Sequence, residues 1–294
     1  MTPLGKDTVI NIIGAGVVGI ATQRFLDHLN FSSVLVDTNI DRLAELRNQG
    51  SIVSPQPTHD AAQLLAFICV PTPFNELEGK HDLAYVRAAI CSTIINQSSK
   101  NVTLVLRSTV TLGTCSILMR EINRNSIHRR TRINLVYMPE FVRQATAEQD
   151  AVNPRRIILG GTNGSAINCL KKMFERYDHI ICTFTDFHTA EMIKMAHNAW
   201  NAVKISYWNE LYRIGQTQSI DMIKVAQEVA ITSEASWNPN YGIKGGFPFG
   251  GACLPKDLCA FIGYSKSLGI EPKILSAAHE INNIERKLKT SFDE

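Results

Sequence analysis

A glycine-rich turn near the start of the chain restricts the possible folds more than any other feature of the sequence. The apolar run Val9–Ile13 leads into the string Gly14-Ala15-Gly16-Val17-Val18-Gly19, and a helical pattern begins at Val17. With this spacing the first glycine allows a tight turn, the second lets backbone approach a pyrophosphate, and the third lets the helix pack closely on the strand. The free N–H groups of the helix start, around Val17 and Val18, then face the phosphates. The motif therefore predicts a strand–turn–helix that binds a dinucleotide.

An acidic residue at the end of the next apolar run specifies which dinucleotide. Asp37 follows the run Ser33–Val36 and lies about 20 residues after Gly19, the usual offset for a carboxylate that accepts a hydrogen bond from the ribose 2′-hydroxyl. Such a carboxylate repels a 2′-phosphate, so the sequence favours NAD over NADP. Arg42 lies close enough to reach a phosphate, so it is a further cofactor candidate and leaves NADP as the alternative.

The turn Val70-Pro71-Thr72-Pro73 ends another apolar run. Ligands of open parallel sheets bind outside the carboxyl ends of the strands. We therefore expect Val70, Pro71 and Thr72 to line the cofactor.

The first half of the chain alternates short, uniformly apolar runs with helical patterns. This alternation is typical of buried parallel strands covered by helices on both faces. Strands are expected at Val9–Ile13, Ser33–Val36, Leu64–Val70, Val102–Leu106, Asn134–Tyr137, Arg156–Leu159 and His179–Phe184. Helices are expected at Val17–Leu29, Ile40–Asn48, Leu83–Asn96, Thr114–Asn125 and Ser165–Arg176. The fold class is α/β, with a Rossmann-like, doubly wound parallel sheet.

The pattern changes near Asp186. From there to Gln218, apolar residues recur at helical spacing without a turn signal, which predicts one long helix. Asp186 and Thr189 offer side chains that cap its start. Further helices are expected at Asp221–Ile231, Lys256–Leu268 and Pro272–Lys289. We divide the chain into an NAD-binding domain, residues 1–185, and an all-α central domain for substrate binding and dimerisation, residues 186–294.

Composition excludes several classes of protein. The formal net charge of the 294 residues is only +3, which argues against nucleic acid or a membrane surface as partner. Seven cysteines are scattered through the chain without zinc-ligand spacing, as expected of reduced thiols in a cytoplasmic protein, and no metal site is expected. No signal peptide is visible, because the first apolar run is short and leads into glycines.

A cysteine in a glycine-rich segment carries the clearest chemical signal in the second half. Cys253 follows Gly250-Gly251-Ala252 and stands just before a predicted helix, with Lys256 close behind. A helix N-terminus and a nearby ammonium both favour the thiolate. A thiolate near a nicotinamide can add to an aldehyde, and after hydride loss a thioester is left for water to cleave. We expect Cys253 to be this nucleophile rather than a structural cysteine.

Two polar side chains on the long helix complete the pattern. Lys194 and Asn198 are four residues apart and therefore lie on one helix face, among Met and Ala residues. A buried ammonium is costly unless it is paired. We expect Lys194 to stabilise the substrate oxyanion, with Asn198 as a neutral donor beside it.

Taken together, these segments resemble the nucleotide-sugar 6-dehydrogenases, the UDP-glucose, UDP-N-acetylmannosamine and GDP-mannose dehydrogenase family. The resemblance spans nearly the whole chain. It rests on the glycine turn, the Pro-Thr-Pro turn, Ser108-Thr109-Val110, Pro139-Glu140-Phe141 with Arg143 and Ala147, Pro154-Arg155-Arg156-Ile157, Ala190-Glu191, Lys194, Asn198, Lys204-Ile205-Ser206, Asn209-Glu210 and Phe249-Gly250-Gly251-Ala252-Cys253-Leu254-Pro255-Lys256-Asp257.

The resemblance implies two successive NAD-dependent oxidations that convert a C6 alcohol to a carboxylate without release of the aldehyde. It implies that Cys253 is the nucleophile and that Lys194 and Asn198 stabilise the oxyanion. It implies that Thr109 and Asp257 position and deprotonate water or the substrate hydroxyl, and that Glu140 serves thioester hydrolysis; the division of base work between Glu140 and Asp257 stays open. Thr109 and Lys256 are also expected at the cofactor. The residues expected to contact substrate are Phe141, Val142, Arg143, Lys194, Asn198, Tyr241, Lys244, Phe249 and Gly250.

The sequence departs from the family in two places. The family has a third, nucleotide-binding α/β domain, which we do not find before Glu294. Asn240 stands where the family has an arginine that reaches the neighbouring subunit's substrate, and no arginine occurs between Arg213 and Arg286. Lys244 is expected to compensate in part.

These departures leave alternatives open. The chain is expected to be a homodimer through the long helix, residues 189–216, and a four-electron 6-dehydrogenase of a nucleotide sugar. The alternatives are a thiol-dependent dehydrogenase of a smaller primary alcohol, such as a nucleoside or glycoside, and a non-catalytic nucleotide-binding relic. A β-hydroxyacid dehydrogenase would keep a helix Lys and Asn but would not require Cys253.

Overall fold

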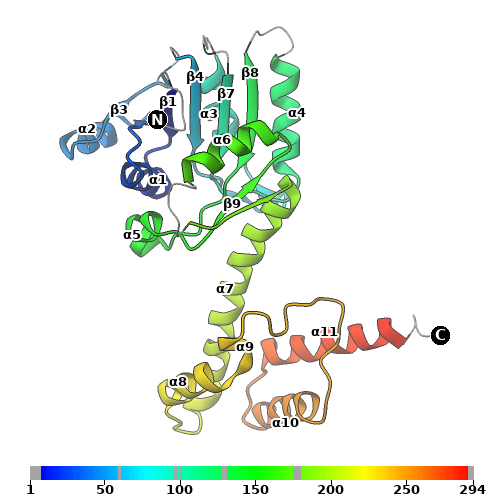
Figure 1. Ribbon diagram of the computed structural model, residues 1–294. Helices are drawn as coiled ribbons and strands as arrows, with labels where there is room; N and C mark the ends of the chain where they lie inside the picture. The colour runs from blue at the N-terminus through cyan, green and yellow to red at the C-terminus, as the bar shows by residue number, and fades with distance from the viewer. Residues whose placement is uncertain are drawn as a thin grey trace. The chain divides into compact units, whose positions relative to one another are not determined.

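The computed structural model describes residues 8–58, 61–95, 99, 101–126, 131–174 and 180–290 (Figure 1). The chain forms two compact units, Met1–Ala196 and His197–Glu294, and helix α7 (Phe187–Gln216) contributes to both. The boundary between the two compact units therefore lies within α7, after Ala196, and not near the start of this helix. The expected division into an NAD-binding domain that ends at residue 185 and a central domain that begins at residue 186 stays a prediction. Among the described residues, no helix is long and apolar enough to cross a membrane.

An eight-stranded sheet forms the centre of the first unit. The strands lie in the spatial order β10 (Cys182–Thr185), β9 (Ile157–Gly160), β8 (Arg132–Tyr137), β7 (Asn101–Leu106), β4 (Gln63–Ile68), β1 (Thr8–Ile13), β2 (Val34–Val36) and β3 (Val53–Ser54). The chain builds outward from β1 in one direction through β2 and β3, and then in the other through β4 and β7. The strand order therefore reverses between β1 and β4, which is where open α/β sheets bind ligands. The expected fold class is confirmed.

One edge of the sheet departs from the expected all-parallel arrangement. β8 pairs with β9 in antiparallel fashion, Tyr137 opposite Gly160, and β10 runs parallel to β9. A parallel neighbour requires a crossover, usually through a helix that packs on the sheet. The segment after β8 instead forms the 3-10 turn η1 (Gln144–Thr146) and helix α5 (Ala147–Val152), which packs against α1 (Val17–His28). Strand β9 therefore starts at the same end of the sheet at which β8 ends, and it runs back in the opposite direction.

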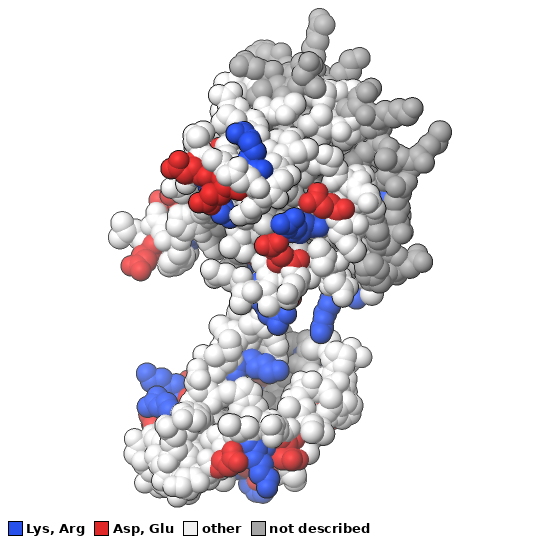
Figure 2. Space-filling view, turned by 90° about the vertical axis from the view of Figure 1, so that its left-hand side faces the viewer, with Lys and Arg blue, Asp and Glu red and all other residues white. Residues whose placement is uncertain are grey.

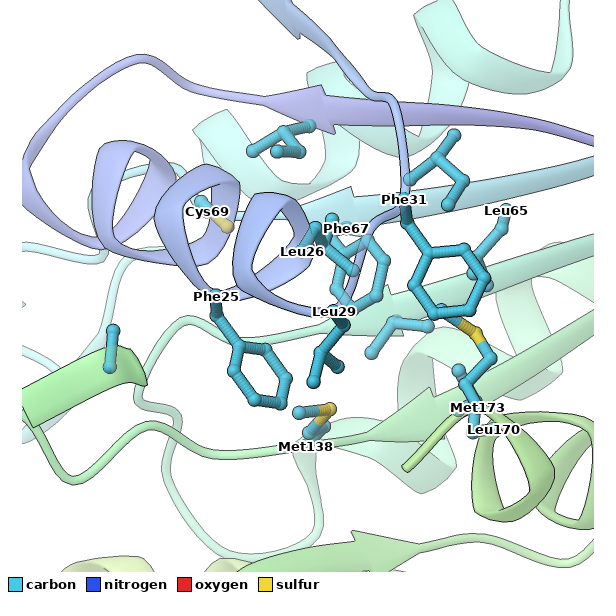
Figure 3. Packing of buried hydrophobic residues seen from close by; sticks show 14 of the residues in the cluster. Phe25, Leu26, Leu29, Phe31, Leu65, Phe67, Cys69, Met138, Leu170 and Met173 are labelled. Carbon is cyan, nitrogen blue, oxygen red and sulfur yellow. The ribbon is translucent and has the colours of Figure 1, made fainter. Parts of the chain in front are cut away.

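Buried apolar residues form two cores, one on each face of the sheet. The other helices of this unit are α2 (Ile40–Asn48), α3 (Ala84–Ile94), α4 (Thr114–Ser126) and α6 (Gly164–Phe174). In β4, Leu65 and Phe67 belong to one core while Leu64, Ala66 and Ile68 belong to the other. Figure 3 shows the first core, where side chains of α1 and α6 meet Leu65 and Phe67. Both strand faces are covered, so the strands are apolar throughout instead of alternating.

The second unit consists of the remainder of α7 with α8 (Met222–Thr232), α9 (Glu234–Trp237), α10 (Leu254–Ser267) and α11 (Lys273–Thr290). The predicted long helix is confirmed, and Asp186 caps it by accepting hydrogen bonds from the backbone N–H and the hydroxyl of Thr189 at 2.9 and 2.6 Å. These bonds lower the pKa of Asp186 to about 2. Glu210 on α7 accepts from the backbone N–H groups of Ile274 and Leu275, and so fixes the first turn of α11.

Several short elements were not predicted. They are β3, the hairpin of β5 (Phe74–Asn75) and β6 (Lys80–His81), η1, α5 and α9, and each is too short to show a hydrophobic period. The expected helix ends at Asn96 and Arg176 and the expected strand start at His179 lie outside the described residues.

Candidate active site

The glycine turn has the geometry that its sequence predicts. Gly14 has a φ of +101°, and its N–H donates to the carbonyl of Val36 at 2.7 Å. A Cβ at Gly19 would collide with the Gly14 carbonyl oxygen, so α1 can approach the turn only without a side chain there. A Cβ at Gly16 would meet nothing within 4 Å. This open space lies at the start of α1, where Gly16 is the cap residue and no side chain binds the free N–H groups of the helix. The space therefore fits a bound phosphate.

We expect Gly19→Ala to destabilise the protein by about 1–3 kcal/mol or more, because the added methyl group forces α1 away from the turn. The matched control is Gly16→Ala, in the same turn, where the methyl group enters open space and should leave the free energy of unfolding near that of the parent. Urea unfolding followed by circular dichroism measures both. Equal stabilities for the two variants would contradict this account of Gly19.

Asp37 lies at the glycine turn. Its carboxylate accepts from the N–H of Ala15 at 2.7 Å and from the N–H of Asn39 at 2.9 Å, which holds the end of β2 against the turn. The half-buried carboxylate is thus fixed at the place the motif predicts. Arg42 forms an ion pair with Glu45 at 2.8 Å on α2, so its guanidinium already has a local partner.

The turns that follow β4 and β7 are bonded to each other. The Ser108 hydroxyl donates to the carbonyl of Val70 at 2.6 Å, and the Thr72 hydroxyl donates to the carbonyl of Thr109 at 2.7 Å. β4 and β7 are neighbours in the sheet, so their carboxyl ends lie at one edge. The structure therefore brings together the Pro-Thr-Pro turn and the Ser-Thr-Val turn.

Lys194 is buried and ion-paired. Its side chain is 4% exposed, and Nζ donates to the backbone carbonyl of Glu140 at 2.6 Å and approaches Oε1 of the same residue at 3.3 Å. Nζ also lies 5.3 Å from the centre of the Phe141 ring. The other oxygen of Glu140 accepts from the N–H of Val142 at 2.7 Å. Lys194 and Glu140 thus form a fixed pair of opposite charges at the end of β8, and neither is a surface residue.

Arg107 is a charged residue of this region, in the polar segment that follows β7, to which the sequence analysis assigned no role. It is 6% exposed, and its Nε has no hydrogen-bond partner among the described residues. Burial lowers the pKa of Arg107, and the nearby Cys69 and Glu140 oppose that shift. The sequence signal that indicates its importance is the position of a charged residue directly before Ser108, at the end of an apolar strand. Cys69 is buried in the first apolar core, and burial raises the pKa of its thiol to about 11.

The other residues expected at the substrate after β8 are held by local contacts. Arg143 forms a bidentate ion pair with Asp150, at 3.0 and 2.7 Å, and this contact holds the pKa of the Asp150 carboxyl well below its usual range. Phe141 and Val142 pack partly against the two apolar cores.

Glu191 fixes the start of α7 close to Lys194. Its carboxylate is fully buried and accepts from the N–H of Gly113 at 2.6 Å and from the N–H of Cys115 at 2.7 Å, at the start of α4. The sequence offered Glu191 only as part of a family motif. In the structure it joins α4 to α7 one turn before Lys194.

We expect Glu191→Gln to lower the free energy of unfolding by about 2–4 kcal/mol, because an amide offers one acceptor where the two buried N–H groups need two. Glu148→Gln is the control, since Glu148 pairs with Arg24 at the surface and should cost less than about 1 kcal/mol. Urea unfolding of the three proteins gives both values. A Glu191 variant as stable as the Glu148 variant would show that this cap contributes little.

In the second unit, Cys253 is the N-cap residue of α10 and is exposed. Its carbonyl accepts from the N–H of Asp257 at 2.9 Å, which forms the first helical turn. Lys256 and Asp257 form an ion pair at 2.7 Å, and both side chains are more than half exposed. Cys253 is therefore not a packed core residue of this unit. Asn198 is exposed on α7, four residues after Lys194.

The glycine-rich loop before Cys253 is attached to α11. The carbonyl of Phe249 accepts from Nδ2 of Asn282 at 3.1 Å and from Arg286 at 3.3 Å. The Lys244 ammonium lies 4.4 Å from the centre of the Phe247 ring. Tyr241 and Gly250 are exposed along the loop, and a Cβ at Gly250 would meet nothing within 4 Å.

Comparison with known proteins identifies relatives over most of the chain. Residues 56–178 match the NAD binding domain of the UDP-glucose/GDP-mannose dehydrogenase family, and residues 188–284 match its central domain. UDP-glucose 6-dehydrogenase TuaD of Bacillus subtilis strain 168 is 30% identical over 299 residues, which cover 94% of this chain and 63% of TuaD. GDP-mannose 6-dehydrogenase of Pseudomonas aeruginosa is 27% identical over 97% of this chain and 70% of the relative. The chain thus spans about two thirds of the length of these relatives.

Solved structures give the same assignment. A ternary complex of GDP-mannose dehydrogenase from Pseudomonas aeruginosa superimposes with a TM-score of 0.82 at 26% identity, covering 96% of this chain and 71% of that one. A UDP-glucose dehydrogenase from Pyrobaculum islandicum superimposes with a TM-score of 0.70 at 25% identity, covering 97% and 70%. An imine reductase from Aspergillus terreus, at 12% identity and a TM-score of 0.66, shares the fold alone.

Proposed function

The chain belongs to the UDP-glucose/GDP-mannose dehydrogenase family, whose NAD binding and central domains it matches, and we propose that it oxidises the C6 primary alcohol of a nucleotide sugar to the carboxylate. NAD is the cofactor that fits the family match and the first unit, where Gly16 leaves open space and Asp37 stands at the turn. When bound, NAD accepts hydride. The observation that carries the proposal is the buried Lys194, which is held against Glu140 at the carboxyl end of β8.

In the proposed reaction, Thr109 and Asp257 position the groups that lose protons, and Lys194 with Asn198 stabilises charge on the substrate oxygen. After the first hydride leaves, the Cys253 thiolate adds to the aldehyde carbon and forms a thiohemiacetal. Loss of the second hydride gives a thioester, which water cleaves with help from Glu140 to give the uronic acid. Support for these roles comes from the burial and pairing of Lys194 and Glu140, and from the exposure of Cys253 at a helix start.

A second candidate is the oxidation of a smaller primary alcohol, such as a nucleoside or a glycoside. The observation that favours it lies in the glycine-rich loop. Asn240 stands where the family has an arginine, and the Lys244 ammonium that we expected to compensate is engaged over the Phe247 ring. The missing arginine leaves less positive charge in this loop for a diphosphate, and the remaining ammonium lies beside an aromatic ring. A third candidate, a non-catalytic nucleotide-binding relic, keeps the fold alone.

NADH formation with UDP-glucose, UDP-N-acetylmannosamine, GDP-mannose and free nucleosides distinguishes the three candidates. Two NADH per molecule of a nucleotide sugar support the proposal. Turnover of nucleosides alone supports the second candidate. Nucleotide binding by calorimetry without any turnover supports the third and contradicts the proposal.

We also propose a homodimer through α7. Several large apolar side chains of the α7 part in the second unit are exposed, and α8 has no buried residue at all. The exposed side chains on α7 are those of Trp200, Val203, Ile205 and Tyr212. Exposed apolar side chains of this size support an interaction surface on α7. On the face that Figure 2 shows, Lys and Arg as well as Asp and Glu occur in small separate groups. Sedimentation velocity at micromolar concentration should give a dimer, and a monomer would contradict this proposal.

A further inference from the structure

The second unit contains a cysteine–histidine–asparagine cluster that the proposed oxidation does not use. Cys259 on α10 has its Sγ 3.5 Å from Nδ1 of His279 on α11, and these two helices are packed together. Nε2 of His279 lies 2.9 Å from the side-chain amide of Asn283, one helical turn later on α11. A thiol therefore contacts an imidazole, and a third group orients that ring. We propose that Cys259 is a second reactive thiol of this chain, which forms mixed disulfides with low-molecular-weight disulfides.

The cluster fixes the imidazole with one nitrogen toward the sulfur. The Asn283 amide nitrogen donates to Nε2, so the neutral ring carries its proton on Nδ1, which faces Sγ. Nδ1–H can therefore donate a hydrogen bond to the sulfur when the thiol has lost its proton to water. The thiolate is the form that attacks a disulfide.

The thiol is accessible from solvent. Cys259 is exposed, while His279 and Asn283 are partly buried behind it. Gly263 lies one turn further along α10 on the same helix face, and a Cβ there would meet nothing within 4 Å. The surface beside the sulfur is thus open to a small molecule.

Cys253 does not supply the partner sulfur. The two cysteines are separated by about 9 Å along α10 and by about 240° around its axis, given the rise and the turn of an α-helix. A disulfide requires Cα atoms within about 7 Å. An intact α10 therefore keeps the two thiols independent, and the sulfur that joins Cys259 comes from solution.

The exchange is balanced without an added oxidant. The Cys259 thiol loses its proton to water, the sulfur attacks one sulfur of the disulfide RSSR, and the RS–SR bond breaks. The leaving thiolate takes a proton from water, so one RSH is released for each mixed disulfide formed.

The test is the rate at which each cysteine of the full chain forms a mixed disulfide with glutathione disulfide, measured by peptide mapping and mass spectrometry. Cys91 is the matched control, since it is exposed on α3 and no described histidine is hydrogen-bonded to it. We expect Cys259 to react about tenfold faster than Cys91 or more, as for other thiols activated by a neighbouring imidazole. His279→Ala should reduce Cys259 to the rate of Cys91, and Asn283→Ala should give an intermediate rate.

A Cys259 that reacts no faster than Cys91 in the parent protein would overturn the proposal, whether or not the variants fold. An unchanged rate in a folded His279→Ala protein, with folding checked by circular dichroism, would do the same. Neither outcome bears on the proposed oxidation, which depends on Cys253.

Discussion

Cys253→Ser should reduce formation of the carboxylate from a nucleotide sugar by at least about three orders of magnitude, because a serine hydroxyl without a positioned base is a far weaker nucleophile than a thiolate. The first oxidation, from alcohol to aldehyde, needs no covalent step and should fall much less. The variant is therefore expected to form at most one NADH per sugar and to accumulate aldehyde. Stopped-flow absorbance of NADH, with product analysis of the quenched mixture, measures both steps.

Cys259→Ser is the matched control for this experiment. It makes the same change six residues later on the same helix, at a thiol without a role in the proposed oxidation. Its rate should equal that of the parent. Full carboxylate formation by Cys253→Ser would remove the nucleophile assignment while leaving the cofactor fold intact.

Lys194→Met should lower kcat by about 10²–10³-fold, because in the proposed reaction Lys194 is the preorganised positive charge that stabilises the developing oxyanion. Methionine keeps much of the length and volume of the lysine side chain, so the site stays filled. The affinity for NAD should change little, since Lys194 does not contact the glycine turn in the described structure. Steady-state kinetics and NAD titration by fluorescence separate the two effects.

The change also leaves Glu140 without its cation, and breaking a buried pair costs about 3–5 kcal/mol. The loss of stability must therefore be measured beside the kinetics. Lys194→Arg keeps the charge and should recover part of the activity. Lys224→Met, at an exposed position on α8, controls for loss of a lysine in general. A folded Lys194→Met protein with parental kcat would exclude the oxyanion role.

Much of the first unit follows from local sequence signals. The limits of α2 were predicted at both ends. In the structure, Asn39 caps the start of this helix by accepting from the N–H of Arg42. The roles of Gly14 and Gly19 were predicted from the glycine spacing between an apolar run and a helical pattern, which is typical of a tight turn with a closely packed helix. The direction of β9 was not predictable, since a uniformly apolar run is the same in a parallel and an antiparallel strand.

The candidate site likewise has some features that could be predicted from the sequence and others that could not. Lys194 was expected to avoid solvent because its neighbours on the helix are apolar, and its burial confirms this. Its pairing with Glu140 joins residues 54 positions apart, and no local pattern encodes such a contact. Arg107 was given no role for the same reason, since its neighbours Cys69 and Glu140 lie on other strands or turns. The roles of Cys253, Asn198 and Asp257 stay predictions.

The thioester on Cys253 is the central claim, and it can be observed directly. Glu140→Gln should slow its hydrolysis more than its formation, so the intermediate should accumulate when the variant is mixed with NAD and the nucleotide sugar that the parent turns over. After an acid quench, peptide mass spectrometry should find up to one uronyl group per chain on Cys253, released by hydroxylamine. Carboxylate formation at a measurable rate, with Cys253 unmodified at every time point, would contradict the account.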